Sequence, residues 1–264
     1  MSFISFLKQN YFLLIFVGCI GFVGVVSVYK LFVAKPTYVY AKIKVGQGMW
    51  WATTQRPSLW YVKAIQQAGE QKDLSGKPLV KLLDVSYYPY FGSGQYDVYV
   101  TVQLKVSKVG NKGTYNFNRE TIGVSSPIDL EFPNVQFSGT IIKLSEVPFK
   151  ESYVKKIIVL VKRVPFPWEY EQIEIGDSQK SGEKEVFIIL DKSVGETADT
   201  TLLQQGSLIS TSTNLFAVKA QILVKKEEEN YVFGEEYVIA PGRVLQGVAT
   251  SKFTFSDYYI TKVE

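Results

Sequence analysis

Two stretches of this chain carry the same series of motifs in the same order, which is the strongest constraint on its fold. The second stretch repeats the Pro-x-x-Trp, Ile-then-Gly-acidic and apolar-apolar-Asp motifs of the first. These pairs are Pro57/Trp60 with Pro165/Trp168, Ile65/Gly69/Glu70 with Ile173/Gly176/Asp177, and Leu82/Leu83/Asp84 with Ile189/Leu190/Asp191. We therefore predict two diverged copies of one unit, over residues 38–146 and 154–264. Chance matches within one unrepeated domain are the alternative, since β sequences share composition.

Both copies have the composition and periodicity of strands. Aromatic residues make up 14% of the chain, and Val, Ile, Tyr and Thr are abundant, as in β-sheets. Apolar residues alternate from Val98 to Val106, which indicates a strand with one buried face. Ser58 and Gly69 bracket a short helical pattern in the first copy. We predict a mainly β protein with two barrel-like or sandwich-like units, each with a short helix, or one pseudo-symmetric barrel formed by both.

An apolar run over residues 11–33 precedes the two copies. No formal charge lies between Lys8 and Lys30, and a run of this length predicts a transmembrane helix behind a short tail of residues 1–10. Gly18, Gly21 and Gly24 share one face of this helix, where they indicate either helix–helix contact in the membrane or ordinary membrane-helix glycine. A cleaved signal peptide is the less favoured alternative, because its apolar core would be shorter.

The charges around the apolar run leave two orientations open. Lysines are more numerous after the run than before it, which by the positive-inside rule would place the large domain in the cytoplasm. That rule is weak for long domains, however, and the N-terminal tail is short. We therefore predict a signal anchor: a single-pass protein of the cell membrane, in contact with the lipid bilayer, with its C-terminal domain outside the cytoplasm.

Several of these features together are similar to a known group of proteins. They are the anchor, the helix ending in residues 65–70, the connection Gly76-Lys77-Pro78 and the strand–hairpin–strand ending of each copy. With them the chain resembles an uncharacterised group of bacterial proteins that have one N-terminal span and an extracytoplasmic β-rich domain. The resemblance implies location and fold class, and it implies no activity.

The residue inventory excludes several kinds of chemistry. The chain has no histidine and one cysteine, so it forms no internal disulfide and lacks the usual ligands of zinc and haem. We predict no metal and no cofactor. The net charge of +4 is small and dispersed, which argues against nucleic acid as a partner.

Carboxylates are the candidates that remain for catalysis. They occur as equivalent pairs in the two copies, namely Glu70 with Asp177 and Asp84 with Asp191. Equivalent placement favours a structural role, because acidic side chains in turns accept backbone N–H groups. We therefore predict that the protein is not an enzyme, and a carboxylate-dependent hydrolase ranks third among the functions considered.

Two aromatic clusters are the candidate contact residues for a partner or a glycan. They are Trp50 and Trp51, and Tyr87, Tyr88, Tyr90 and Phe91. Exposed rings at a loop or strand end stack on sugars or anchor a protein partner, whereas buried ones would cover the core. Trp60 and Trp168 occupy equivalent places in the copies, which indicates shared packing instead.

The leading functional prediction is a non-enzymatic, membrane-anchored, extracytoplasmic scaffold or partner-binding protein of a cell-envelope assembly. Its expected partners are another protein or further copies of the same chain. The alternative is a module that binds cell-wall or surface glycan through the aromatic clusters.

Overall fold

The computed structural model describes residues 11–32, 37–46, 56–73, 76–90, 94–109, 114–163, 166–196, 200–204, 207–211 and 214–264. The chain divides into two compact units, Met1–Thr37 and Tyr38–Glu264. Each is considered by itself. Both β-rich halves belong to the second unit, so their contacts with each other are contacts within one compact body.

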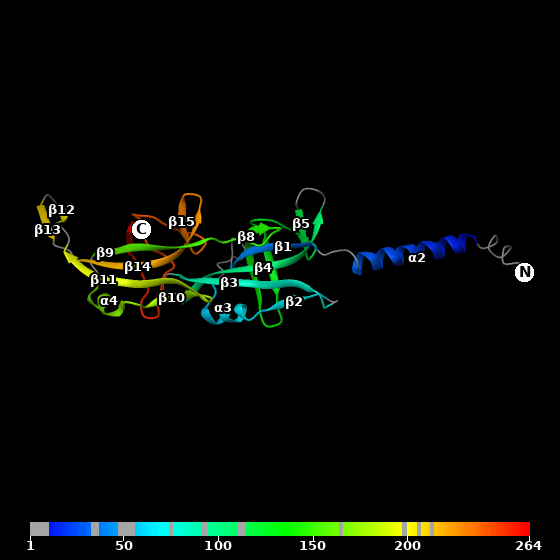
Figure 1. The fold of residues 1–264 in the computed structure, drawn as a ribbon, viewed down its shortest axis with the longest axis horizontal. Coiled ribbons are helices and arrows are strands. Elements are labelled where there is room, and N and C mark those ends of the chain that lie inside the picture. Colours follow the sequence, from blue (N-terminus) through cyan, green and yellow to red (C-terminus); the bar gives the residue numbers. More distant parts are fainter. Residues whose placement is uncertain are drawn as a thin grey trace, which may run out of the picture. The chain divides into compact units, whose positions relative to one another are not determined.

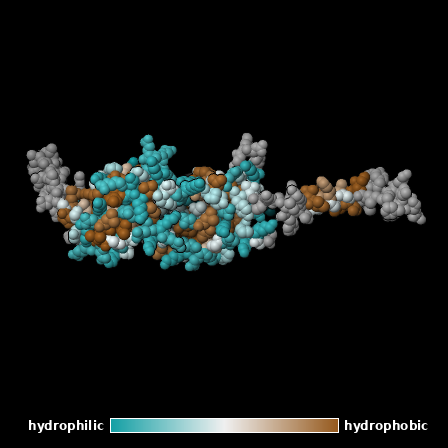
Figure 2. Space-filling model, viewed as in Figure 1, coloured by the Kyte–Doolittle hydropathy of each residue, from teal (hydrophilic) through white to brown (hydrophobic). Residues whose placement is uncertain are grey.

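The prediction of a transmembrane helix over residues 11–33 is wrong. The first unit contains one helix, α2 (Tyr11–Phe32), but no helix in the described part of the chain is long and apolar enough to cross a membrane. Figure 2 shows this helix as a mainly hydrophobic surface. The signal anchor and single-pass topology, which depended on that helix, are likewise not supported.

The predicted β-rich class is confirmed, and the first sheet draws its strands from the first half of the second unit. Among the described residues it has eight strands, in the order β2-β3-β4-β1-β8-β7, with β5 and β6 continuing from β4. Figure 1 shows β1, β3 and β4 running alongside one another. The strands are β1 (Thr37–Val45), β2 (Glu70–Lys72), β3 (Pro78–Tyr90), β4 (Gln95–Val109), β5 (Thr114–Phe117), β6 (Glu120–Ile122), β7 (Pro127–Glu131) and β8 (Gln136–Ser145).

The second sheet has seven strands in the described residues. Its central order is β10-β11-β14-β9-β17, and β15 and β16 continue from β14. A separate hairpin follows β11 and consists of β12 (Thr200–Gln204) and β13 (Ser207–Thr211). The other strands are β9 (Tyr153–Arg163), β10 (Ser178–Ser181), β11 (Lys184–Glu196), β14 (Asn214–Glu227), β15 (Asn230–Phe233), β16 (Tyr237–Ile239) and β17 (Tyr259–Val263).

The two sheets have equivalent topologies. The order β2-β3-β4-β1-β8 in the first corresponds to β10-β11-β14-β9-β17 in the second. Irregularities recur as well: β3 shifts register between Leu82 and Asp84, and β11 shifts between Ile189 and Asp191. Since β-bulges are specific local features, their recurrence supports the alignment of Asp84 with Asp191.

One short helix precedes the edge hairpin of each sheet. The first, α3 (Leu59–Gln66), buries Val62 and Ile65, and Gly69 follows it in the left-handed conformation at φ 72°. Ser58 occupies the N-cap position, although its side chain makes no capping hydrogen bond. The second, α4 (Pro167–Gln172), starts with proline, whose fixed φ suits the first turn.

Each sheet encloses its own apolar core, and two tyrosines cross between them. The first core runs from Val39 to Ile141 and the second mainly from Ile158 to Ile260. Tyr88 and Tyr99 belong to the first sheet by sequence, yet both are buried in the second core. Tyr88 lies edge-on to Phe233, with 5.1 Å between ring centroids. Apolar burial therefore joins the two halves. We call the region where they meet, which includes Tyr88, Tyr99 and Phe233, the seam.

Candidate binding surfaces

The hairpin β10–β11 of the second half lies against the free edge of β3 in the first. Tyr87 donates its backbone N–H to Ser181 Oγ at 2.8 Å. Gly182 has φ 63°, and a Cβ there would lie 3.1 Å from the carbonyl oxygen of Val85, so the approach depends on glycine. The turn thus covers the part of β3 that β2 leaves unpaired.

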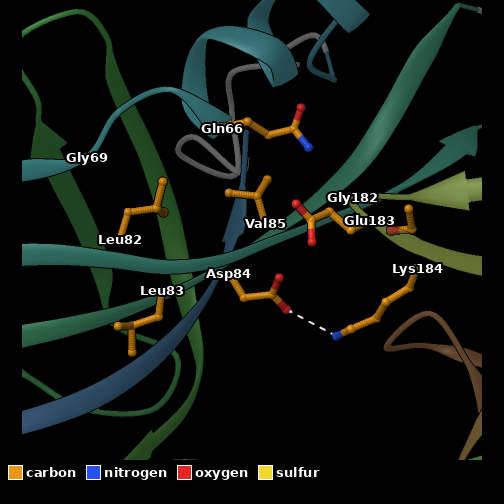
Figure 3. Close-up of a pocket in the computed structure, with 10 residues that line it drawn as sticks. Gln66, Gly69, Leu82, Leu83, Asp84, Val85, Gly182, Glu183 and Lys184 are labelled. Carbon is orange, nitrogen blue, oxygen red and sulfur yellow. Dashed lines mark ion pairs between the residues drawn. The ribbon is translucent and has the colours of Figure 1, made fainter.

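A groove of about 560 Å³ opens beside this contact (Figure 3). Gln66 and Gly69 line it from the side of α3, and Glu183 lines it from the hairpin. Across it, Lys184 Nζ lies 3.6 Å from Asp84 Oδ2, and both side chains are about half exposed. An exposed pair of this kind contributes little to stability, although it contributes to the register of the contact.

A buried cluster of ions lies deeper in the same seam. Lys42 of β1 and Lys225 of β14 both contact Glu151 and Glu235. The side chains of Lys42 and Glu235 are only 3% and 2% exposed, and their atoms Nζ and Oε1 are 2.8 Å apart. Tyr153 donates its hydroxyl to Glu151 at 2.5 Å. Two lysines and two carboxylates balance in charge, which buried ions require.

The cluster shifts the pKa values of its members. Burial alone would raise the pKa of Glu151, but hydrogen bonds from Lys42, Tyr153 and Lys225 lower it to about 2. Burial would likewise lower the pKa of Lys42, and the attraction of Glu235 with the bonds to both carboxylates raises it instead. For Lys225 burial dominates, and its pKa is lowered. All these groups serve to join the halves, and a catalytic role is not needed to explain them.

A second buried carboxylate, Asp97 of β4, faces the hairpin β15–β16. Tyr237 donates its hydroxyl to Asp97 Oδ2 at 2.8 Å, and Arg56 donates Nε–H to Oδ1 at 3.0 Å. Beside it, Lys44 Nζ lies 2.5 Å from Glu236 Oε1. The hairpin of the second half is therefore held to the first by both ionic and hydroxyl contacts.

Another groove, of about 510 Å³, has an aromatic wall and a polar wall. The rings of Tyr87 and Tyr96 form the first wall, meeting edge-to-face at 5.6 Å between centroids. The second carries Lys180, Thr250 and Ser251. Rings beside hydroxyl and ammonium groups are suited to a polar ligand with an apolar face.

The predicted aromatic contact residues separate into three groups. Tyr87 lines the groove, whereas Tyr88 is a core residue. Tyr90 lies at the end of β3, with the Arg56 guanidinium carbon 3.4 Å from its ring centroid. Trp50, Trp51 and Phe91 lie outside the described residues. The three helix glycines, Gly18, Gly21 and Gly24, lie in α2, where a Cβ would find nothing within 4 Å among the described atoms.

Trp60 and Trp168, which the sequence predicted to be packed, are exposed. Trp60 is 73% exposed at the first turn of α3, and Trp168 is 49% exposed at the equivalent turn of α4. Trp168 stacks on Phe166 at 5.7 Å, and Phe166 is itself exposed. The equivalent positions of the two tryptophans therefore reflect a surface feature that occurs in both halves. Their place in the first helical turn, outside the apolar stripe of the helix, was the sequence signal that indicated exposure.

The repeated carboxylates have local structural partners. Asp177 Oδ1 accepts the backbone N–H of Ser178 at 3.0 Å, and Asp191 Oδ1 accepts that of Lys192 at 2.9 Å. Glu70 Oε1 lies 3.4 Å from Lys81 Nζ on the adjacent strand. Within the described residues, no group of three or more His, Cys, Asp or Glu side chains is arranged to hold a metal ion.

Among the described residues, no hairpin turn covers the edge of β11 as one covers the equivalent edge of β3. Here β10 pairs with residues 184–188, and beyond the bulge the described residues contain no strand on the outer side of residues 190–195. We call these residues the open edge. Val194 on it is 56% exposed and Leu190 is exposed as well. Tyr170 of α4 borders the open edge, because its carbonyl oxygen accepts a bond from Lys192 Nζ at 2.5 Å.

Comparisons with protein-family models, curated proteins and solved structures found no match for this chain. Its function is therefore inferred from the surfaces described above.

Proposed function

We propose that this protein is a non-enzymatic scaffold that binds a protein partner along the open edge of β11. The observation that carries the proposal is the unequal use of two equivalent edges. On β3 a hairpin turn covers the edge, whereas the same part of β11 presents unpaired backbone and exposed apolar side chains in the described part of the chain. Exposed strand edges are templates for pairing with another chain.

The body that presents the open edge is held together across its seam. The ion cluster of Lys42, Lys225, Glu151 and Glu235 joins the halves, and Tyr88 inserts into the second core. A partner that binds such a body loses little free energy in ordering it, which favours affinity. The predicted envelope location depended on the transmembrane helix, so we restrict the proposal to partner binding.

The test uses a proline on the open edge. Val194 pairs with Phe216 of β14 on its inner side, and its equivalent, Tyr87, donates its N–H outward. Val194→Pro therefore removes an outward donor and leaves the inner ladder intact. Val194→Thr keeps the donor and the branched shape and is the matched control.

We expect chemical crosslinking in the native cells to give the same partner adducts for wild type and Val194→Thr, and to lose them for Val194→Pro. Circular dichroism confirms that the variants are folded. Equal adducts from all three proteins would refute binding at the open edge.

The second candidate function is glycan binding in the groove of Tyr87 and Tyr96. It is favoured by the aromatic wall facing Lys180 and the hydroxyls of Thr250 and Ser251. Tyr87→Ala removes half of that wall, and Tyr259→Ala removes an exposed ring on β17 as the control. On a glycan array, binding by wild type and Tyr259→Ala but not by Tyr87→Ala supports this function. Absence of binding by wild type removes it.

A further inference from the structure

We infer that one face of the second sheet binds the same face of a second copy of this chain, so that two copies form a two-fold dimer. We call it the outer face, because it is turned away from the apolar core of the second half. The register of β11, β14, β9 and β17 places its residues in two rows across the sheet. The rows are Ser193, Ala217, Val161 and Tyr259, and Asp191, Lys219, Val159 and Lys262.

The outer face is distinct from the binding surface proposed above. Its residues alternate along their strands with core residues such as Leu160 and Val218, so their side chains point to the opposite side of the sheet. The open edge would bind through the backbone of one strand, whereas the outer face presents side chains of four strands. The inference therefore goes beyond the proposed function and does not depend on it.

The first sheet uses the equivalent face for contact. Lys42 of β1 pairs with β8 beside a register shift, and Val159 of β9 pairs with β17 beside the equivalent shift. This alignment makes Val159 and Val161 the counterparts of Lys42 and Lys44. Both lysines are buried, because the hairpin β15–β16 of the second half covers them. With valine in place of lysine at both positions, the outer face is suited to an apolar contact and not to an ionic one.

The outer face is open to solvent in the described part of the chain. Tyr259 is 49% exposed, and Val159, Val161 and Ala217 are only partly buried. Figure 1 shows β9, β14 and β11 side by side, so the rows form one continuous surface. A contiguous patch of exposed apolar side chains on a soluble body is typical of a protein contact.

Side-chain sizes make the outer face complementary to itself. A two-fold axis parallel to the strands, between β14 and β9, places β11 of one copy over β17 of the other and keeps each row opposite itself. Ser193 then faces Tyr259 of the second copy, a small side chain opposite a large one. Ala217 faces Val161 in the same way. Two sheets pack face to face when their side chains interdigitate, and a two-fold contact requires a self-complementary surface.

The charges match in the same arrangement. Asp191 would lie opposite Lys262 of the second copy, and the symmetry forms this pair twice. Within one chain, Lys262 Nζ lies 2.5 Å from Glu264 Oε1, but the two side chains are 66% and 43% exposed, so this pair contributes little and is readily exchanged. Lys219 would cover Val159 with its apolar stem and keep its ammonium group at the rim.

Charge reversal tests the orientation of the two copies. The full chain is measured by sedimentation velocity over a range of concentrations, as wild type, Asp191→Lys, Lys262→Asp and a 1:1 mixture of the two variants. We expect wild type to dimerise and each variant to do so roughly tenfold more weakly. The mixture should recover the dimer, because the lysine placed in the first variant meets the aspartate placed in the second, and the native pair forms on the other side of the axis. Asp129→Lys, on the exposed face of β7, is the control and should behave as wild type.

Val161→Lys tests the apolar centre of the contact. It introduces the residue that the equivalent position of β1 already holds, so the strand should accommodate it. We expect the dimer to be lost, because an unpaired ammonium group would be buried between the sheets. Val238→Lys changes a valine of β16 that is 37% exposed and lies off the outer face, and should leave the dimer intact. Circular dichroism confirms that the variants are folded.

Three results would overturn the inference: a monomeric wild type, association unaffected by Val161→Lys, or a mixture that does not recover what the single reversals lose. Since α2 is unchanged in every protein, any association through its apolar surface cancels in the comparison. Val194→Pro alters no side chain of the outer face, so failure of this dimer and failure of binding at the open edge are separate results.

Discussion

Glu151→Gln is the sharpest test of the ion cluster that joins the two halves. Glu151 lies in the connection between the sheets, its side chain is 20% exposed, and Lys225 Nζ is 2.9 Å from its Oε1. Its pKa falls from 4.5 to about 2 on folding because Lys42, Tyr153 and Lys225 outweigh the effect of burial. At 1.36 kcal/mol per pKa unit, this difference corresponds to about 3 kcal/mol of stability. Breaking a buried ion pair costs roughly the same, 3–5 kcal/mol.

The dependence on pH follows from the sign of the shift. Because the pKa of Glu151 is lower in the folded protein, the unfolded chain binds more protons between about pH 2 and pH 4.5. The contribution of Glu151 is therefore complete above this window and disappears as the pH falls through it. Urea titrations followed by tryptophan fluorescence should show Glu151→Gln about 3 kcal/mol less stable than wild type at pH 7, with the difference shrinking towards pH 3.

Glu146→Gln is a close control. Glu146 also bonds to a lysine and a tyrosine, Lys108 at 3.0 Å and Tyr115 at 2.5 Å, but it is exposed to water. We expect its substitution to leave the urea midpoint almost unchanged, because water screens such a pair. A loss below about 1 kcal/mol for Glu151→Gln at pH 7, or a loss equal at all pH values, would refute the role assigned to the buried cluster.

Two further substitutions test the packing. Tyr88→Ala removes a buried ring that lies 5.1 Å from Phe233 across the seam, and should lower the free energy of unfolding by about 3–5 kcal/mol in urea titrations, whereas half-buried Tyr87→Ala should cost clearly less. Equal losses would contradict the placement of Tyr88 in the second core. Gly139→Ala places a Cβ 2.5 Å from Ile43 Cγ2 and from Lys44 O, and should cost about 1–3 kcal/mol by thermal denaturation. Gly123→Ala, whose Cβ would meet nothing closer than 3.8 Å, should leave the melting temperature unchanged.

Local patterns in the sequence predicted local structure well. Alternation from Val98 to Val106 corresponds to β4, in which the apolar residues Val98, Val100, Val102, Leu104 and Val106 are all buried. The helix pattern between Ser58 and Gly69 corresponds to α3. These features depend on periodicity and turn chemistry, which a short window of sequence contains.

Features that depend on distant residues were missed. Lys42 and Lys44 alternate with Ala41 and Ile43 on β1, a pattern that ordinarily indicates a solvated face. Both lysines are buried, because the hairpin β15–β16, far along the chain in the second half, covers them with Glu235 and Glu236. Tyr88 likewise alternates as an ordinary strand residue, and its place in the second core depends on how the halves meet.

Contacts between residues far apart in the sequence also explain why two halves with equivalent strand orders have unequal edges. Both halves have the bulge, the aspartate that follows it and an edge hairpin before it. The first half has Tyr88 and Asp97 at its edge, and these bury an aromatic ring and a carboxylate against the second half. Gly195 and Leu215 stand at the corresponding positions of the second sheet, so β11 has neither the ring nor the carboxylate there.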